Sequence, residues 1–101
     1  MLDQLTSVDF IPCLHQAFTI RIESAEPIKL ELASVTNLAA AGERANQAQR
    51  LFSLLFLGPV SQHYLLQHTY RIEHEQLGAL DLFLVPVGPE GGRMRYEAIF
   101  N

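Results

Sequence analysis

Four histidines are the residues whose type most readily suggests chemistry, because imidazole nitrogens bind metals and act as general bases. His68 and His74 lie six positions apart in one extended run, about 20 Å along a strand. That is too far for one ion with ligands near 2 Å. His63 and His68 could approach each other across a loop, with Glu73 or Glu75 as a third ligand, but no compact Cys/His cluster exists. The spacing therefore predicts no metal and no other cofactor.

The serines and carboxylates likewise form no catalytic pattern. None of the serines considered as nucleophiles lies in the Gly-x-Ser-x-Gly frame of a nucleophile elbow. Ser53 falls inside an apolar run and is expected to be a hydrogen-bonded packing residue. Glu73 and Asp81 could face each other across a hairpin, although charges on the outer side of a strand are ordinarily solvated. We predict no catalytic residues.

Phosphate and nucleic-acid binding are also disfavoured. The glycine-rich loop at 88–92 lacks the Lys-Ser/Thr pair and following helix of a phosphate-binding loop. The chain has seven Lys and Arg against eleven Asp and Glu, for a net charge of −4. Arg93 and Arg95 are the only close basic pair, and Glu90 and Glu97 flank them. Because nucleic-acid affinity depends mainly on phosphate neutralisation, we expect no nucleic-acid partner.

The elements that must position these residues are mostly strands. The C-terminal third predicts a β-meander, with alternating strands at 68–74, 79–87 and 93–100 and short links between them. Two further alternating runs, 17–23 and 28–35, predict a hairpin.

The middle of the chain holds a sixth predicted strand, at 50–57. It is apolar on both faces and is expected to end at Gly58-Pro59. The Ala/Gln-rich stretch 37–49 predicts a loop or frayed helical turn, and 60–67 a connection with a possible helical turn.

A short N-terminal helix is expected over residues 5–16. Thr6 and Asp9 have the spacing of a capping box, but a helix that began there would carry Pro12 in its interior. A start at Asp9 would place Pro12 in the tolerated first turn. We favour that start, or two short turns.

The length of 101 residues indicates one domain spanning 1–101. With 49% hydrophobic and 18% charged residues, the chain can form a modest core, for which Leu54, Phe56, Leu82 and Leu84 are the expected centre. The single cysteine, Cys13, excludes an intramolecular disulfide. The predicted fold is mainly β, a small six-stranded antiparallel barrel or sandwich with a short N-terminal helix.

The N-terminus has no basic region followed by a long apolar stretch, so no signal peptide is expected. The apolar runs are shorter than ten residues, well below the length of a membrane-spanning helix. These features predict a cytoplasmic protein with no membrane contact.

Two strands are apolar on the side that a barrel interior would not cover. Their outer faces form the candidate interaction surface, which consists of Leu51, Leu55, Leu57, Phe83 and Val85. We expect a homodimer or a protein partner to cover part of it. The alternative is that the segment 60–67, with Tyr64, Leu65 and Leu66, folds over it as a lid.

Several segments resemble an uncharacterised family of small bacterial domains of unknown function. They are FSLLF at 52–56 with Gly58-Pro59, YRIEH at 70–74, Leu77-Gly78, LFLVPVGP at 82–89 and YEAIF at 96–100. The resemblance implies no activity, and it implies membership of phage-tail-like or secretion-associated assemblies. The expected function is thus a non-catalytic interaction or assembly module. A barrel that binds a small apolar ligand is the second alternative and an enzyme the third.

Overall fold

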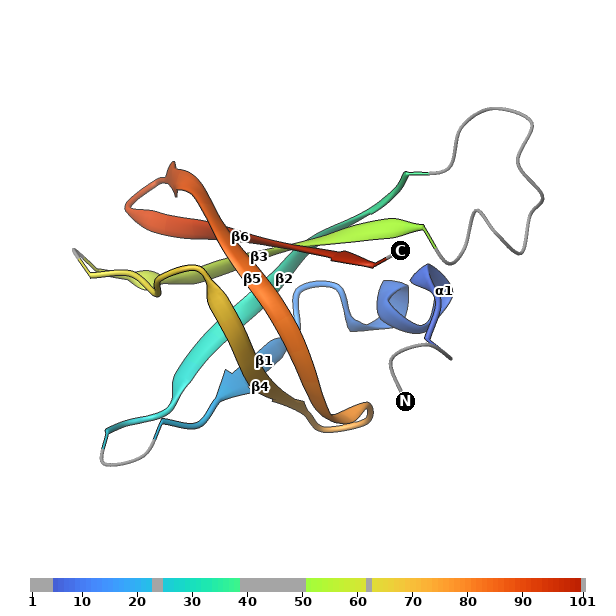
Figure 1. Ribbon diagram of the computed structural model, residues 1–101, viewed down its shortest axis with the longest axis horizontal. Coiled ribbons are helices and arrows are strands. Elements are labelled where there is room, and N and C mark those ends of the chain that lie inside the picture. Colours follow the sequence, from blue (N-terminus) through green and yellow to red (C-terminus); the bar gives the residue numbers. More distant parts are fainter. Residues whose placement is uncertain (1–4, 23–24, 39–50, 62, 101) are drawn as a thin grey trace.

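Six strands form a closed antiparallel barrel (Figure 1). The computed structural model describes residues 5–22, 25–38, 51–61 and 63–100. The strands are β1 (Ala17–Ile20), β2 (Ile28–Asn37), β3 (Phe52–Val60), β4 (His68–His74), β5 (Gly78–Glu90) and β6 (Arg93–Phe100). Their order around the barrel is β1-β2-β3-β6-β5-β4. The predicted mainly β, six-stranded fold is confirmed, as a barrel.

Strand β3 differs from its predicted limits at both ends. It begins at Phe52, and it runs through Gly58-Pro59 to Val60, so the prediction that this pair ends the strand is wrong. The pairing of β3 with β6 shifts register between Leu57 and Val60. Such a bulge tolerates a proline because the local ladder is already interrupted.

Strand β5 likewise continues past its predicted end at Val87. It reaches Glu90, and its pairing with β6 shifts register between Pro86 and Gly88. The predicted loop at 88–92 therefore shrinks to the two-residue turn Gly91-Gly92, whose φ values are 60° and 79°. Two consecutive positive φ values are those of the tight hairpin turn that glycine favours.

The N-terminal helix is shorter than predicted. One α-helical turn, α1 (Ser7–Phe10), is followed by one 3₁₀ turn, η2 (Ile11–Cys13). The Asp9 carboxylate accepts a hydrogen bond from the Thr6 backbone N–H at 2.8 Å, as in a capping box. The favoured start at Asp9 is therefore wrong and the alternative of two short turns is right, because Pro12 falls in the second turn.

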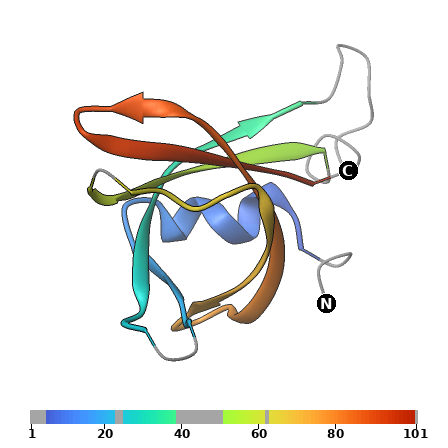
Figure 2. The same cartoon turned by 60° about the vertical axis from the view of Figure 1, so that its left-hand side comes forward.

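The core fills the barrel as expected. Leu54, Phe56, Leu82 and Leu84 are all buried, which confirms the predicted centre. At one end of the barrel α1 lies beside the last residue of β6 (Figures 1 and 2). The Phe10 ring there packs 5.7 Å from the Phe52 ring and 5.4 Å from the Phe100 ring. The helix thus closes this end with an aromatic cluster, in contacts worth about 0.5–1.5 kcal/mol per pair beyond area burial.

The connections that follow β2 and β3 are only partly described. Most of the predicted 37–49 connection lies outside the described residues. In the 60–67 connection, Ser61 and residues 63–67 form no helix. Among all the residues that the structure describes, no helix has the length and apolar character needed to cross a bilayer.

Candidate interaction surface

The alternation of side chains along β3 and β5 places the predicted surface residues on the outside of the barrel. Leu55 and Leu57 lie between the inward residues of β3, and Phe83 and Val85 between those of β5. Phe83 is 51% exposed, whereas the other predicted residues, including Leu51 just before β3, are half-buried.

Strand β6 joins these two sets of residues, since it lies between β3 and β5 in the barrel. Its Glu97 pairs with Leu55 on one side and with Val85 on the other. Leu55, Glu97 and Val85 therefore form one row across three strands. Leu57 lies in a more polar row, between Glu31 and Arg95.

Ile99 is a surface residue that the sequence reasoning missed. It lies two positions beyond Glu97, on the same outer side of β6, and is 57% exposed. The alternation of β6, which assigned Tyr96 and Ala98 to the interior, carried the signal. We refer to Leu55, Phe83, Val85, Glu97 and Ile99 together as the β3–β6–β5 face.

A shallow opening divides part of this face, because β5 and β6 separate. Their pairing begins at Val85 and Glu97, whereas residues 78–84 of β5 pair with β4 alone. Residues 98–100 of β6 pair with β3 alone. Between the two strands lies a hollow of about 240 Å³, here called the β5–β6 cleft. Its lining consists of Thr69, Asp81, Leu82, Phe83, Ala98, Ile99 and Phe100.

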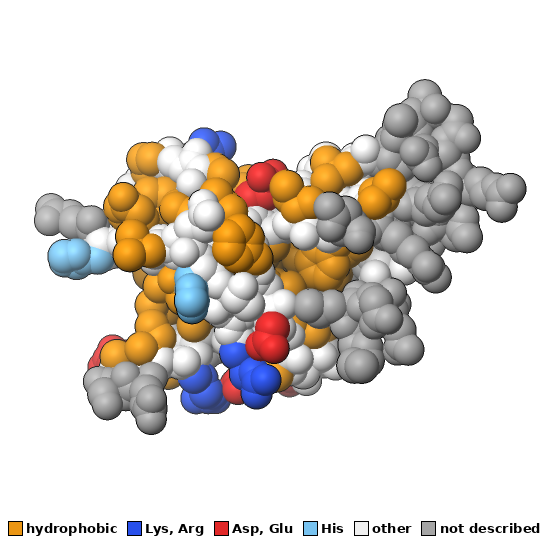
Figure 3. All heavy atoms as spheres, viewed as in Figure 1, with side chains coloured by type: hydrophobic (Ala, Val, Ile, Leu, Met, Phe, Trp, Pro, Cys, Tyr) orange, Lys and Arg blue, Asp and Glu red, His pale blue; other side chains and the backbone are white. Residues whose placement is uncertain are grey.

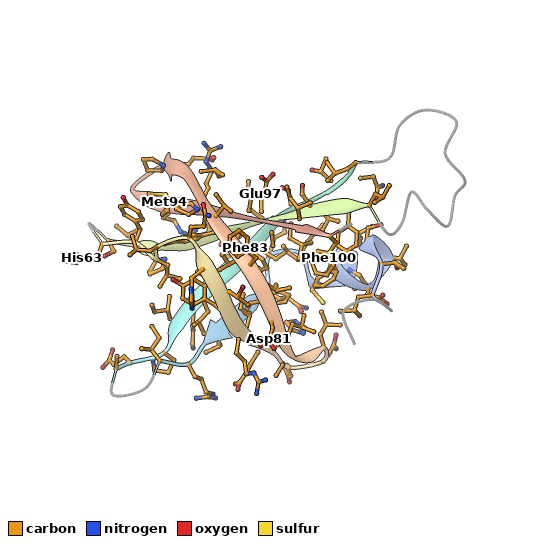
Figure 4. The ribbon with its side chains drawn as sticks, viewed as in Figure 1. His63, Asp81, Phe83, Met94, Glu97 and Phe100 are labelled. Atoms are coloured by element: carbon orange, nitrogen blue, oxygen red, sulfur yellow. The ribbon has the colours of Figure 1, made fainter. Side chains whose placement is uncertain are left out.

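Acidic side chains flank the cleft on two sides. Figure 4 shows Phe83 and Phe100 on one face of the molecule, with Glu97 on one side and Asp81 on the other. In Figure 3, the same view, acidic side chains lie on either side of hydrophobic ones. Asp81 forms an ion pair with Arg71 at 3.3 Å. Glu97 has no hydrogen-bond or ion-pair partner among the residues that the structure describes. The face therefore presents one unpaired carboxylate between apolar side chains.

The suggested opposition of Glu73 and Asp81 is wrong. Glu73 pairs with Ala79 in the sheet, and Asp81 pairs with Arg71. The Glu73 carboxylate instead accepts a hydrogen bond from Arg21 Nε at 2.7 Å. The register thus places an arginine, not a second carboxylate, opposite Asp81, and each carboxylate is partly neutralised on the surface.

A second hollow, of about 230 Å³, lies at the other end of the barrel. Its lining consists of Ile28, Pro59, Ser61, His63, Tyr64, Leu65 and Tyr96. The Tyr96 hydroxyl accepts a hydrogen bond from the Leu65 N–H at 2.8 Å, which fixes the 63–66 segment to the barrel. Burial raises the pKa of Tyr96, and the bond from Leu65 partly opposes that rise.

The alternative that the 60–67 segment acts as a lid is not supported at Phe83. Leu65 packs against the core, but Tyr64 and Leu66 are exposed. The Tyr70 hydroxyl donates a hydrogen bond to the Leu66 carbonyl at 2.7 Å, which attaches the segment to β4. Because Phe83 stays half-exposed, this segment leaves it uncovered.

One histidine, His74, is part of the packed structure, whereas His63 and His68 are exposed. The buried His74 ring stacks on Phe18 at 4.5 Å, and its Nε2 lies 2.8 Å from Gln16 Oε1. Its Nδ1 accepts hydrogen bonds from the N–H groups of Gln76 and Leu77, at 3.1 and 3.3 Å. These bonds assign the proton of the neutral ring to Nε2. His74 therefore organises the β4–β5 turn.

No three His, Cys, Asp or Glu side chains gather at metal-binding distance in the described part of the chain. Cys13 is buried, and burial, followed by the charge of Asp9, raises the pKa of its thiol. A thiol of raised pKa in a buried site has little thiolate character and is a poor nucleophile. Ser53 is buried within β3, as expected of a packing residue.

The fold is a small closed β-barrel, and its β3–β6–β5 face carries apolar side chains and one carboxylate. A family model described as a domain of unknown function (DUF6916) matches residues 5–100. The chain therefore belongs to the DUF6916 family, which confirms the resemblance to an uncharacterised family of small domains. Neither a curated protein nor a solved structure shows significant similarity to the chain.

Proposed function

We propose that this domain is a non-catalytic interaction or assembly module that binds a protein through the β3–β6–β5 face. The observation that carries the proposal is the exposure of Phe83 and Ile99, at 51% and 57%, beside the same cleft. Exposed large apolar side chains scattered singly are common on protein surfaces. Here they adjoin the half-buried Leu55 and Val85 across three neighbouring strands, so a partner could cover them together.

The sizes of the two hollows favour this proposal over a ligand-binding barrel. Ligand pockets commonly measure about 300–1,000 Å³. The hollows here measure about 240 and 230 Å³. The barrel interior itself is occupied by buried apolar side chains of all six strands. Cytoplasmic location and membership of a phage-tail-like or secretion-associated assembly belong to the same proposal.

A charge introduced into the face tests the proposal. We expect the wild-type chain either to exceed monomer mass in light scattering at micromolar concentration or to retain a protein from a lysate of its source cells. Phe83→Asp should abolish both without lowering the melting temperature, since the side chain is already half in solvent. Val60→Asp is the matched control, because Val60 is 76% exposed and lies outside the face.

Strictly monomeric wild-type protein that retains nothing, together with a Phe83→Asp variant of equal solubility and stability, would refute the proposed function. Association lost equally in both variants would mean that the binding surface lies elsewhere.

The second hollow supports a second candidate, the binding of a small apolar ligand. Ile28, Pro59 and Leu65 give it an apolar lining, while Ser61 and Tyr96 supply hydroxyl groups. An environment-sensitive apolar dye such as anilinonaphthalene sulfonate should then bind with a defined stoichiometry. Ile28→Asp should weaken that binding and Phe83→Asp should not. Equal dye binding to both variants would argue against this second function.

A further inference from the structure

The edges of β5 and β6 at the cleft are open. In the described part of the chain, residues 78–84 of β5 have a strand neighbour on one side only, and so do residues 98–100 of β6. A strand with one neighbour presents a row of unpaired N–H and C=O groups to its other side. The barrel closes toward the β5–β6 hairpin, where residues 85–90 and 93–97 pair, so the two open edges diverge from that hairpin.

The open part of β5 has few of the features that usually protect an edge. Proteins guard such edges with prolines, bulges or lysines. In β5 the prolines and the register shift all lie at 86–89, where the strand is already paired. The open residues 78–84 read GALDLFL, and their one charge, Asp81, forms its ion pair with Arg71 of β4.

The side chains around the cleft suit an extended occupant. Leu82 and Ala98 form its nearly buried floor, and Phe83 and Ile99 stand exposed at its sides. Side chains of a strand alternate between its two faces. An added strand could therefore direct alternate side chains toward the floor and lay the others beside Phe83 and Ile99.

The charges around the cleft favour a basic partner over a second copy of this chain. Glu97 is unpaired among the described residues and Asp81 flanks the other side. All four arginines of the described part, Arg21, Arg71, Arg93 and Arg95, already bind carboxylates or carbonyl oxygens. Lys29 is the one described cation with no such partner, so the described part of a second copy would bring its own Glu97 to the interface with one unpartnered lysine to match it.

We propose that the β5–β6 cleft binds an extended segment of a different protein, which pairs with the open edge of β5 and places a lysine or arginine beside Glu97. This binding mode, the addition of a strand to an exposed sheet edge, obtains affinity from main-chain hydrogen bonds and specificity from alternate side chains. The inference rests on the proposed function and specifies the kind of partner and the atoms that it uses.

The probe for this inference is a library of random twelve-residue peptides displayed on phage. Selection for binding to the wild-type domain, with removal of peptides that also bind Phe83→Asp, should enrich alternating apolar sequences that contain lysine or arginine. In the complex with an enriched peptide, every second backbone amide of residues 79–84, those that face the open edge, should gain protection from hydrogen exchange, as measured by NMR, because the others already face β4. N-methylation of alternate peptide amides should weaken binding at least tenfold, because it removes the hydrogen bonds that define an added strand.

Glu97→Gln should weaken binding of the basic peptides about two- to fivefold and reduce its dependence on salt, as expected for an exposed ion pair. Glu90→Gln, which makes the same change of charge at the far end of β5, is the matched control and should leave the dissociation constant unchanged.

Several results would overturn the inference. No enriched peptide, enrichment without basic residues, or amide protection elsewhere would each exclude strand addition by a basic segment. Protection of residues 79–84 that appears in wild-type protein alone and grows with its concentration would show that a second copy occupies the cleft. If the domain associates through Phe83 but the edge amides stay unprotected, the proposed function stands and strand addition is wrong.

Discussion

Gly58 lies directly against the ring of Tyr96, and a Cβ atom at Gly58 would come within 3.1 Å of Tyr96 Cε2. The same tyrosine is buried and accepts the hydrogen bond from Leu65. One close contact between β3 and β6 therefore supports the ring that fixes the 63–66 segment. A side chain at Gly58 would therefore require the Tyr96 ring to shift by a few tenths of an ångström.

Gly58→Ala should destabilise the domain by about 1–3 kcal/mol, since the Tyr96 ring that must shift is buried and its hydroxyl is hydrogen-bonded to Leu65. Chemical denaturation measures this change. The penalty should shrink in a Tyr96→Leu background, where the ring that the methyl group meets is gone. Additive effects of the two substitutions would show that the added methyl group meets another neighbour.

Leu82→Ala should lower the free energy of unfolding by about 2–5 kcal/mol, because it leaves a cavity at the centre of the core. Phe83→Ala is the matched control on the next residue, which faces outward and is half-exposed. Its cost should stay below about 1 kcal/mol. A loss under about 0.5 kcal/mol for Leu82→Ala would contradict the assigned face.

His74→Ala should destabilise the domain by about 1–3 kcal/mol, because two backbone N–H groups of the β4–β5 turn lose their acceptor. His68→Ala is the control, since that ring is exposed. Equal melting temperatures for the two variants would show that the turn does not depend on His74.

Treatment with a metal chelator should leave the stability of the domain unchanged. The described residues offer no cluster of metal ligands, and His74 uses both ring nitrogens in hydrogen bonds. The melting temperature should therefore be the same with and without EDTA. A clear decrease with EDTA that zinc reverses would contradict this prediction.

Glu31 should make the stability of the domain depend on acidic pH. A hydrogen bond with His15, and then one from Arg93, lower the pKa of Glu31 below its ordinary value of 4.5. A carboxylate with a lowered folded-state pKa stabilises the protein above its unfolded pKa, and that contribution disappears as pH falls through the folded value. The wild-type domain should thus have a larger free energy of unfolding than Glu31→Gln at pH 7. This difference should disappear as the pH is lowered. Denaturation across pH 3–7 measures it, with the exposed Glu75→Gln as control, and a difference that is constant with pH would contradict the linkage.

The amino-acid sequence by itself determined which side of most strands faces the core. Alternation along 68–74 and 93–100 predicted both strands at their observed limits, and the two-faced apolar runs identified Leu54, Phe56, Leu82 and Leu84 as core. These are local properties, since successive side chains of any strand point to opposite faces. The same pattern identified Phe83 and Val85 as outward residues.

Other features were decided only by the tertiary structure. The neighbours of β6 follow from barrel closure, so no local pattern could show that Glu97 lies between Leu55 and Val85. The limits of β3 and β5 depended on bulges that let the strands continue past Pro59 and Pro86, against their local propensity. The cleft arises because β5 pairs with β4 along one half and with β6 along the other, which is a property of the closed sheet as a whole.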